Sequence, residues 1–312
     1  MITHSITPSE QRPDPFAPPA RIEALAEATY RALPAANYSS LKVLLDRSPA
    51  HVKGLVRKET AAFSIGHLAH AMILEGHAVA ERFNVQPKIE RPTTNQGKAQ
   101  LVAWLAEVTA TAPPASDEKA EGKRLDAQLA ALRLVLEERG ITVVSQADFT
   151  AAQTMRDKLM GHRKIGPLIE GATREVTFIA EHRRSGVLVK ARLDLVNETA
   201  GTPIVLDLKT TQNASWGEFT RSIGKYQYHL QAALYRWAYA EVMGRWPAWC
   251  WVCVESEPPY ECAWYEPERK VIEAGEARME AALNLWADCE QAGRWPGYAE
   301  DLQSISLPSY SL

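Results

Sequence analysis

The segment 175–211 constrains the fold most, because its hydrophobic pattern predicts three successive antiparallel strands. The second strand alternates with a period of two, which is typical of a half-buried strand. One face carries Val187, Val189, Ala191, Leu193 and Leu195, and the other carries Lys190, Arg192 and Asp194. The third strand, 204–209, is apolar except for Asp207 and Lys209, and a turn with Gly201 and Pro203 precedes it.

Asp207 and Lys209 are two residues apart, so their side chains leave the same face of the strand. A hairpin would bring Asp194 close to this pair. Charges in an apolar strand are costly unless they are paired or metal-bound. Two interpretations stay open: an ordinary ion pair on a solvated edge, or a site for metal-assisted phosphodiester hydrolysis. In the second, carboxylates hold Mg²⁺ and the ammonium orients water or neutralises developing charge.

The pattern Asp194, Asp207-Leu208-Lys209 resembles the core motif of the PD-(D/E)XK nuclease superfamily. The chain resembles in particular its RecE-type (exonuclease VIII-like) branch of phage recombination exonucleases. Three further segments match that branch in order: 38–42 followed by Ser48-Pro49, 66–75 with a G-x-x-x-H spacing, and Tyr228-x-x-Gln231-x-x-x-Tyr235. The resemblance covers residues 38 to 265. The acidic residue of the D-x-K motif is Asp207 rather than Glu, which the branch accepts.

The resemblance implies an α/β fold, with a mixed central sheet flanked by helices and a helical N-terminal part. It assigns the metal to His70, Asp194, Asp207 and the Leu208 carbonyl, with Glu175 for a second ion. Lys209 would assist the attacking water. Without the resemblance, His70 is equally an ordinary helical histidine and Glu175 an exposed strand-end residue.

The residues that follow the lysine are candidate substrate contacts. Gln231 is expected to position substrate or water, Tyr235 to buttress it, and Thr210 to donate to a phosphate. Tyr228 lies on the same helix face as Gln231 and Tyr235, at i, i+3 and i+7. An aromatic stripe of this kind is also typical of a buried core.

The chain is expected to form a flexible tail (1–20) and one nuclease domain (21–312). That domain comprises a helical part (21–165), the catalytic sheet with its helices (170–292) and a C-terminal arm (293–312). Helices are predicted over 20–33, from Ser39 or Ser40 to Leu45, and over 60–83, 94–110, 127–138, 148–160, 219–242 and 266–292. Further strands are predicted at 141–144, 248–255 and 261–265.

Composition excludes several classes. With 312 residues and 46% hydrophobic content, the chain can bury a sizeable core. It has neither an apolar run of about 20 residues nor a secretory signal, so a soluble cytoplasmic protein without membrane contact is expected. The net charge of −3 argues against a non-specific polyanion binder. Basic clusters at 156–164 and 183–192 are either solvated faces or a groove that tracks phosphates.

Four cysteines do not suggest a disulfide framework. Cys250-x-x-Cys253, with Cys262 and Cys289, raises the possibility of an iron–sulfur cluster. However, a spacing of three within a strand places the first two on opposite faces, which favours buried structural thiols.

The resemblance therefore predicts a Mg²⁺-dependent exodeoxyribonuclease in which Mn²⁺ substitutes. It would digest linear double-stranded DNA from 5′ to 3′ and leave 3′ overhangs for a single-strand annealing protein. A ring-shaped homo-oligomer is expected. Two alternatives remain: a non-catalytic module that binds DNA ends, and a metal-dependent endonuclease of restriction or repair type.

Overall fold

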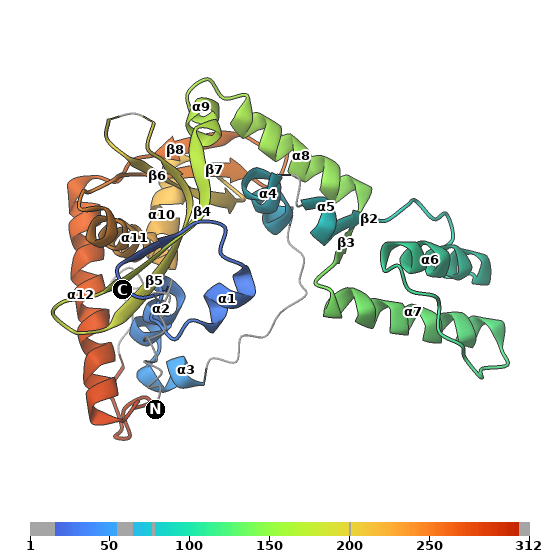
Figure 1. Ribbon diagram of the computed structural model, residues 1–312, viewed down its shortest axis with the longest axis horizontal. Helices are drawn as coiled ribbons and strands as arrows, with labels where there is room; N and C mark the ends of the chain where they lie inside the picture. The colour runs from blue at the N-terminus through green and yellow to red at the C-terminus, as the bar shows by residue number, and fades with distance from the viewer. Residues whose placement is uncertain (1–15, 55–64, 77–78, 200, 306–312) are drawn as a thin grey trace, which may run out of the picture.

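The protein is described from a computed structural model, which covers residues 16–54, 65–76, 79–199 and 201–305 (Figure 1). Six strands form the main sheet in the order β1-β4-β5-β6-β7-β8. They are β1 (Ala20–Ile22), β4 (Ala172–Glu181), β5 (Leu188–Asn197), β6 (Ile204–Thr211), β7 (Ala248–Glu255) and β8 (Cys262–Tyr265). Neighbours run antiparallel except β6 and β7, which are parallel. The predicted unit of three antiparallel strands is thus confirmed.

The ladder between β5 and β6 is short. It has three register pairs, Leu195↔Leu206, Val196↔Val205 and Asn197↔Ile204, whereas β6 pairs with β7 from Ile204 to Thr211. Beyond these pairs β5 is held by β4, and β6 is held by β7. The two strands therefore separate at the level of Asp194 and Asp207.

One face of the sheet packs on α2 (Tyr38–Asp46), α10 (Trp216–Tyr226), α11 (Tyr228–Met243) and α12 (Arg269–Ala292). These helices and the inward residues of the strands form the first core. Helix α12 lies so close to α11 that a Cβ on Gly275 would be 2.1 Å from the His229 carbonyl oxygen. Strand β1 is fixed to this layer through Glu198, which accepts hydrogen bonds from Arg21 (2.8 Å) and from the Tyr239 hydroxyl (2.5 Å).

The other face packs on α4 (Ile65–Leu74), α8 (Gln146–Met160) and α9 (Ile165–Glu170), which form the second core. The apolar stripe predicted for the histidine-bearing helix is confirmed, since Leu68, Ala69, Met72 and Ile73 are all buried. Ser145 caps α8, with its hydroxyl accepting from the Asp148 amide.

A third group of elements lies to the right of the main sheet in Figure 1. It consists of α5 (Val79–Arg82), β2 (Phe83–Val85), α6 (Asn95–Val108), α7 (Glu121–Glu138) and β3 (Thr142–Val144). Strands β2 and β3 pair in parallel, and α6 and α7 share their own small core. Residues 111–120 between the helices have no regular structure.

Four predicted helix boundaries are wrong. The helix predicted over 20–33 is replaced by β1, which pairs with β4, and by the short α1 (Glu27–Ala32). The helix predicted over 60–83 is interrupted. Within the described residues it is replaced by α4, α5 and the first residue of β2. Helix α2 is capped by Asn37, with Ser40 as its capping-box partner rather than the cap. Helix α3 (Pro49–Lys53) then begins after Ser48.

The fourth correction concerns the helix predicted over 219–242, which breaks at Gln227. This residue has φ +56° and ends α10 while starting α11. Its side chain contacts Asp46 and accepts a hydrogen bond from Arg278 (2.8 Å). Contacts with distant residues therefore stabilise a conformation that glutamine rarely adopts.

The predicted tail lies mostly outside the described residues, as does the end of the predicted C-terminal arm. The described part of that arm, 294–305, has no helix or strand. None of the described helices is long and apolar enough to cross a membrane. The predicted α/β class, with a mixed sheet flanked by helices, is confirmed.

Candidate active site

Asp207 and Lys209 project from β6 on the face that α11 covers. The Asp207 side chain is 1% exposed and forms an ion pair with Lys209, whose side chain is 13% exposed. The solvated ion pair at an edge, one of the two interpretations of the spacing, is therefore wrong. Both charges lie inside the sheet, between β5 and β7.

Asp194 reaches this pair from the neighbouring strand. Its Oδ2 accepts a hydrogen bond from the Leu208 amide at 2.8 Å. This bond follows directly after the last ladder pair, Leu195↔Leu206. The Asp194 carboxylate therefore accepts from β6 where a main-chain carbonyl of β5 would otherwise do so. The structure thus brings Asp194 and the Asp207-Leu208-Lys209 segment together, and Leu208 contacts Asp194 through its amide rather than its carbonyl.

Gln231 forms hydrogen bonds with both Asp207 and Lys209. From α11, its Nε2 donates to Asp207 Oδ1 at 2.9 Å and its Oε1 accepts from Lys209 Nζ at 3.1 Å. The residue is 7% exposed, so both bonds are shielded from water. Such charge-assisted bonds fix the two partners relative to each other.

His70 enters the site from α4. Its Nε2 lies 3.4 Å from Asp194 Oδ2, and its side chain is 36% exposed. One helical turn earlier, Gly66 faces the end of β6, where a Cβ would be 2.4 Å from Thr210 Oγ1. Gly66 therefore leaves the space in which β6 approaches α4.

Glu175 lies across from Asp194 in the β4–β5 pairing, between Arg174↔Leu195 and Val176↔Leu193. Its φ of +49° is unusual for a residue other than glycine. The face alternation predicted for β5 also breaks here, because Leu193 packs in the first core and Leu195 in the second. The irregular backbone at Glu175 and Asp194 therefore changes the direction in which the side chains of β5 point.

Charge in the site is strongly coupled. Burial raises the pKa of Asp207, Asp194 raises it further, and Lys209 opposes both. Burial also acts on Asp194, but His70 and Lys209 outweigh it and lower that pKa. The pKa of Glu175 is raised, mainly by burial. Two carboxylates thus share one ammonium, which leaves the site with an excess of negative charge.

These donors fit a hard divalent cation. Asp207 Oδ2 is buried and makes no hydrogen bond, although it contacts the Lys209 ammonium. His70 and Asp194 add an imidazole and a second carboxylate on the solvent side. No group of three His, Cys, Asp or Glu side chains within the described ranges is already gathered around one point. Mg²⁺ matches such a partial set, because it binds one or two carboxylates and keeps several waters.

The remaining predicted substrate contacts divide into two groups. Tyr228 and Thr210 line a cavity of about 720 Å³ that opens beside Lys209, whose Nζ lies 4.7 Å from the Tyr228 ring centroid. Tyr235 is 8% exposed and packs edge-on against Trp249 in the first core. Its placement agrees with a buttressing role and not with direct contact to substrate.

Tyr38 is a site residue that the sequence pattern did not predict. Its hydroxyl donates to the Tyr226 carbonyl, and burial raises its pKa, with Tyr228 and Asp207 adding to the effect. Its hydrogen bond places it next to Tyr226, which lines the cavity beside Lys209. The resemblance of residues 38–42 to a family motif is the one signal that points to it.

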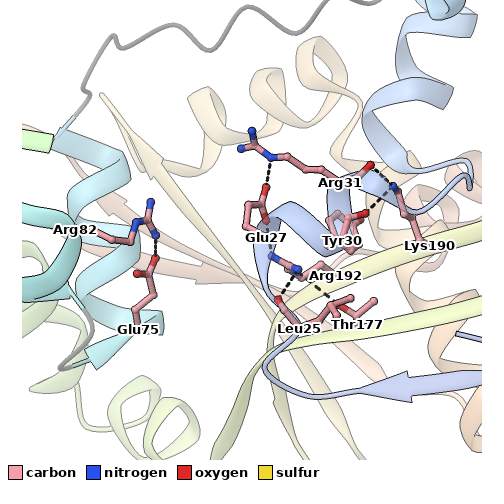
Figure 2. Close-up of polar contacts among 9 residues, drawn as sticks. All are labelled: Leu25, Glu27, Tyr30, Arg31, Glu75, Arg82, Thr177, Lys190 and Arg192. Atoms are coloured by element: carbon pink, nitrogen blue, oxygen red, sulfur yellow. Dashed lines mark hydrogen bonds and ion pairs between the residues drawn. The ribbon is translucent and has the colours of Figure 1, made fainter. Parts of the chain in front are cut away.

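Neither of the two interpretations of this basic cluster, a solvated face or a phosphate groove, matches the surroundings of Lys190 and Arg192, whose side chains bond to the segment around α1 (Figure 2). Lys190 donates to the carbonyls of Tyr30 (2.8 Å), Arg31 (3.2 Å) and Leu33 (2.6 Å). Arg192 donates to the Leu25 carbonyl and pairs with Glu27.

The segment that carries α1 thus covers this part of the basic cluster. On the opposite side of the view lies the ion pair of Glu75 and Arg82.

Cys250, Cys253 and Cys289 are buried, as predicted for structural thiols, whereas Cys262 is only partly buried. All four are free, and Cys250 packs in the second core while Cys253 packs in the first. Their opposite faces do not suit a shared cluster. Burial raises the pKa of Cys250 to about 12, which keeps the thiol protonated.

Comparison with known proteins places the chain in a family. Residues 38–308 match the family described as a PDDEXK-like domain of unknown function, so the chain belongs to that family. A crystal structure of a candidate exonuclease from Eubacterium rectale aligns with 91% of this chain and 95% of its own, at 11% identity and a TM-score of 0.51. The PD-(D/E)XK fold class predicted from the sequence is therefore confirmed.

A second solved structure, of SSO0001, aligns over 70% of this chain and 87% of its own, at 16% identity and a TM-score of 0.25. This likeness is too weak to support an argument. No curated protein matches the sequence.

Proposed function

We propose that this protein is a Mg²⁺-dependent exodeoxyribonuclease of the RecE type. The observation that carries the proposal is the buried triad of Asp207, Lys209 and Gln231, with Asp194 and His70 beside it. Membership of a PDDEXK-like family supports a nuclease, and nucleases of this superfamily generally use divalent metals such as Mg²⁺.

Each side chain has a role that its surroundings support. Asp194, Asp207 and His70 would hold the cation, with Glu175 available for a second ion. A bound Mg²⁺ or Mn²⁺ supplies charge stabilisation to the phosphate and lowers the pKa of water. Lys209, whose ammonium is kept charged by the two carboxylates, orients the attacking water and neutralises developing charge. Gln231 holds that ammonium in place.

The finer features rest on the family resemblance. They are a 5′-to-3′ direction on linear duplex DNA, 3′ overhangs delivered to a single-strand annealing protein, and a role in phage recombination. A ring-shaped homo-oligomer and a cytoplasmic location in a bacterial or phage-infected cell complete the proposal.

Digestion of linear and closed circular duplex DNA tests the reaction. With Mg²⁺, the linear DNA should disappear while the circle survives, and EDTA should protect both. Cutting of the circle would replace the exonuclease with an endonuclease. Binding without cleavage of either DNA would favour a non-catalytic module that binds DNA ends. Release of label from the 5′ end before the 3′ end tests the direction.

Two substitutions test the site. Asp207→Ala and Lys209→Ala should each abolish cleavage while far-UV circular dichroism stays close to that of the unaltered protein. Calorimetry with Mg²⁺ should separate them, because Asp207→Ala weakens metal binding and Lys209→Ala spares it. Unaltered cleavage rates in either variant would contradict the assignment.

A further inference from the structure

The cavity beside Lys209 has a second wall that the proposed chemistry does not use. Helix α10 forms this wall and presents Arg221, Lys225 and Tyr226, all exposed. Of the described residues around the cavity, only Glu218 is acidic, and it is paired with Arg221. Apart from Lys209, which the two site carboxylates share, the described lining of the cavity therefore has two cations against one carboxylate, together with an aromatic ring.

Tyr226 is the open end of a column of stacked rings. Its ring centroid lies 5.5 Å from that of Tyr228, which lies 6.1 Å from Phe219, which lies 5.3 Å from Tyr265. The interplanar angles are 30°, 27° and 15°. Phe219 is 2% exposed, whereas Tyr226 is 42% exposed. The column is thus anchored in the core and offers a ring at the surface.

The direction of this wall is fixed by the break at Gln227. Because α10 and α11 do not form one helix, α10 takes its own direction, which the contacts of Gln227 with Asp46 and Arg278 hold. Tyr38 adds a hydrogen bond to the Tyr226 carbonyl. The wall is therefore preorganised and needs little ordering when a ligand binds.

We propose that the exposed face of α10 binds an unpaired nucleic-acid strand next to the phosphate that is cleaved. The inference rests on the proposed function in one respect, which is that the scissile phosphate lies at Lys209. Arg221 and Lys225 contact backbone phosphates of that strand, and a base stacks on Tyr226.

The chemistry of the wall selects this ligand class. Arg221 and Lys225 are four residues apart on one helix face, so their Cβ atoms are about 5–6 Å apart and their long side chains reach successive phosphates. Aromatic rings beside a positively charged groove are the usual means of binding single strands without sequence preference. A base inside a duplex has both faces covered by its neighbours, so only an unpaired base can stack on Tyr226.

Lys225 packs over the ring on which the base would stack. Its Nζ lies 5.2 Å from the Tyr226 ring centroid, over the ring. The side chain is exposed, so it can turn toward a phosphate and leave the ring to a base. The cation–π contact therefore holds the platform ready when no strand is bound.

Fluorescence anisotropy of a labelled single-stranded oligodeoxythymidine tests the proposal. The full chain is used in EDTA, so that no cleavage competes with binding. The doubly substituted Arg221→Gln, Lys225→Gln protein should bind more weakly. Its plot of log K against log salt should be less steep by about 1.4, because each phosphate of a single strand that a cation neutralises adds about 0.7 to the slope.

The ring is tested by a matched pair of substitutions. Tyr226→Leu should weaken binding about 5-fold or more, because stacking on the base is removed. Tyr226→Phe keeps the ring and should restore binding. Arg133→Gln, an exposed arginine on α7, is the charge control and should leave both affinity and salt slope unchanged. An oligoribonucleotide of the same length shows whether the strand is DNA or RNA.

Several results would overturn the proposal: an unchanged salt slope in the double variant, full affinity in Tyr226→Leu, or no binding of single strands by the unaltered protein. Tighter binding of a blunt duplex that does not depend on Tyr226 would do the same. Because these measurements need no cleavage, they are decided separately from the digestion of linear and circular DNA.

Discussion

Replacing Gly66 by alanine tests how closely α4 fits the end of β6. The added Cβ would lie 2.4 Å from Thr210 Oγ1 and 3.1 Å from Thr210 Cβ, whereas ordinary contact begins at 3.4 Å. Overpacking of this kind costs about 1–3 kcal/mol. Alanine in place of glycine in a helix recovers about 0.5–1 kcal/mol. The free energy of unfolding should therefore fall, by up to about 2.5 kcal/mol.

The same substitution should change sign when Thr210 is also replaced by alanine. Thr210→Ala removes Oγ1, and the remaining Cβ–Cβ distance of 3.1 Å needs a shift of only a few tenths of an ångström. In that background Gly66→Ala should raise the free energy of unfolding by about 0.5 kcal/mol. The coupling free energy between the two positions should then be about 1–3 kcal/mol.

Urea unfolding of the four proteins, followed by circular dichroism, measures this coupling. Equal m-values would show that the denatured states are comparable. Additivity within about 0.5 kcal/mol would refute the reasoning, because residues that do not touch show no coupling. The cleavage rate should follow the same pattern, since Thr210 adjoins Lys209. Gly66→Ala should slow cleavage more in the unaltered protein than it does in the Thr210→Ala background.

Three further predictions concern other contacts. Gln231→Leu removes both hydrogen bonds that join the acid to the base and should lower the free energy of unfolding by about 2–3 kcal/mol, measured in urea; a decrease below about 0.5 kcal/mol would contradict their importance. Gly275→Ala should cost at least about 1–3 kcal/mol, because the clash is with backbone. Its control, Gly224→Ala, meets nothing within 4 Å and should not destabilise the protein. Glu198→Gln tests how the free energy of unfolding depends on pH. Burial raises the pKa of Glu198, but hydrogen bonds from Tyr239 and Arg21 outweigh it, so the folded pKa lies below the usual value. The stabilisation is therefore present above the unfolded pKa and lost as pH falls through the folded pKa. The variant should be less stable by about 1 kcal/mol at pH 7 and should equal the unaltered protein in acid; a difference that persists in acid would refute the linkage.

The centre of the fold could be predicted because its signals are local. The spacing of Asp207 and Lys209 is a property of neighbouring residues, and it suffices to place the two charges on one face of β6, whereas the alternation predicted for β5 holds only as far as Leu193. The approach of β6 to α4 could be expected as well, because Gly66 leaves the space that Thr210 occupies. The first signal lies within a few residues of its effect, whereas the second depends on Thr210, which is distant in the sequence.

The wrong predictions have causes that are distant in sequence. Glutamine favours helices, so nothing near Gln227 signals a break, and the contacts that stabilise it come from Asp46 and Arg278. Lys190 and Arg192 would alternate with apolar residues in the same way if they faced solvent, a ligand or another segment. The sequence pattern therefore does not distinguish these surroundings. Only the folded chain shows that the residues around α1 cover them.

The short ladder between β5 and β6 gives the sheet a seam. One half, β1-β4-β5, is joined to the other, β6-β7-β8, by three register pairs and by the bond from the Leu208 amide to Asp194. Asp194 therefore belongs both to the candidate metal site and to the joint between the halves. A ligand that draws its Oδ2 away from Leu208 loosens the joint, and by reciprocity a strain that spreads the halves changes the affinity for that ligand. The stiffness of the sheet at this joint would therefore depend on whether a ligand is bound to Asp194.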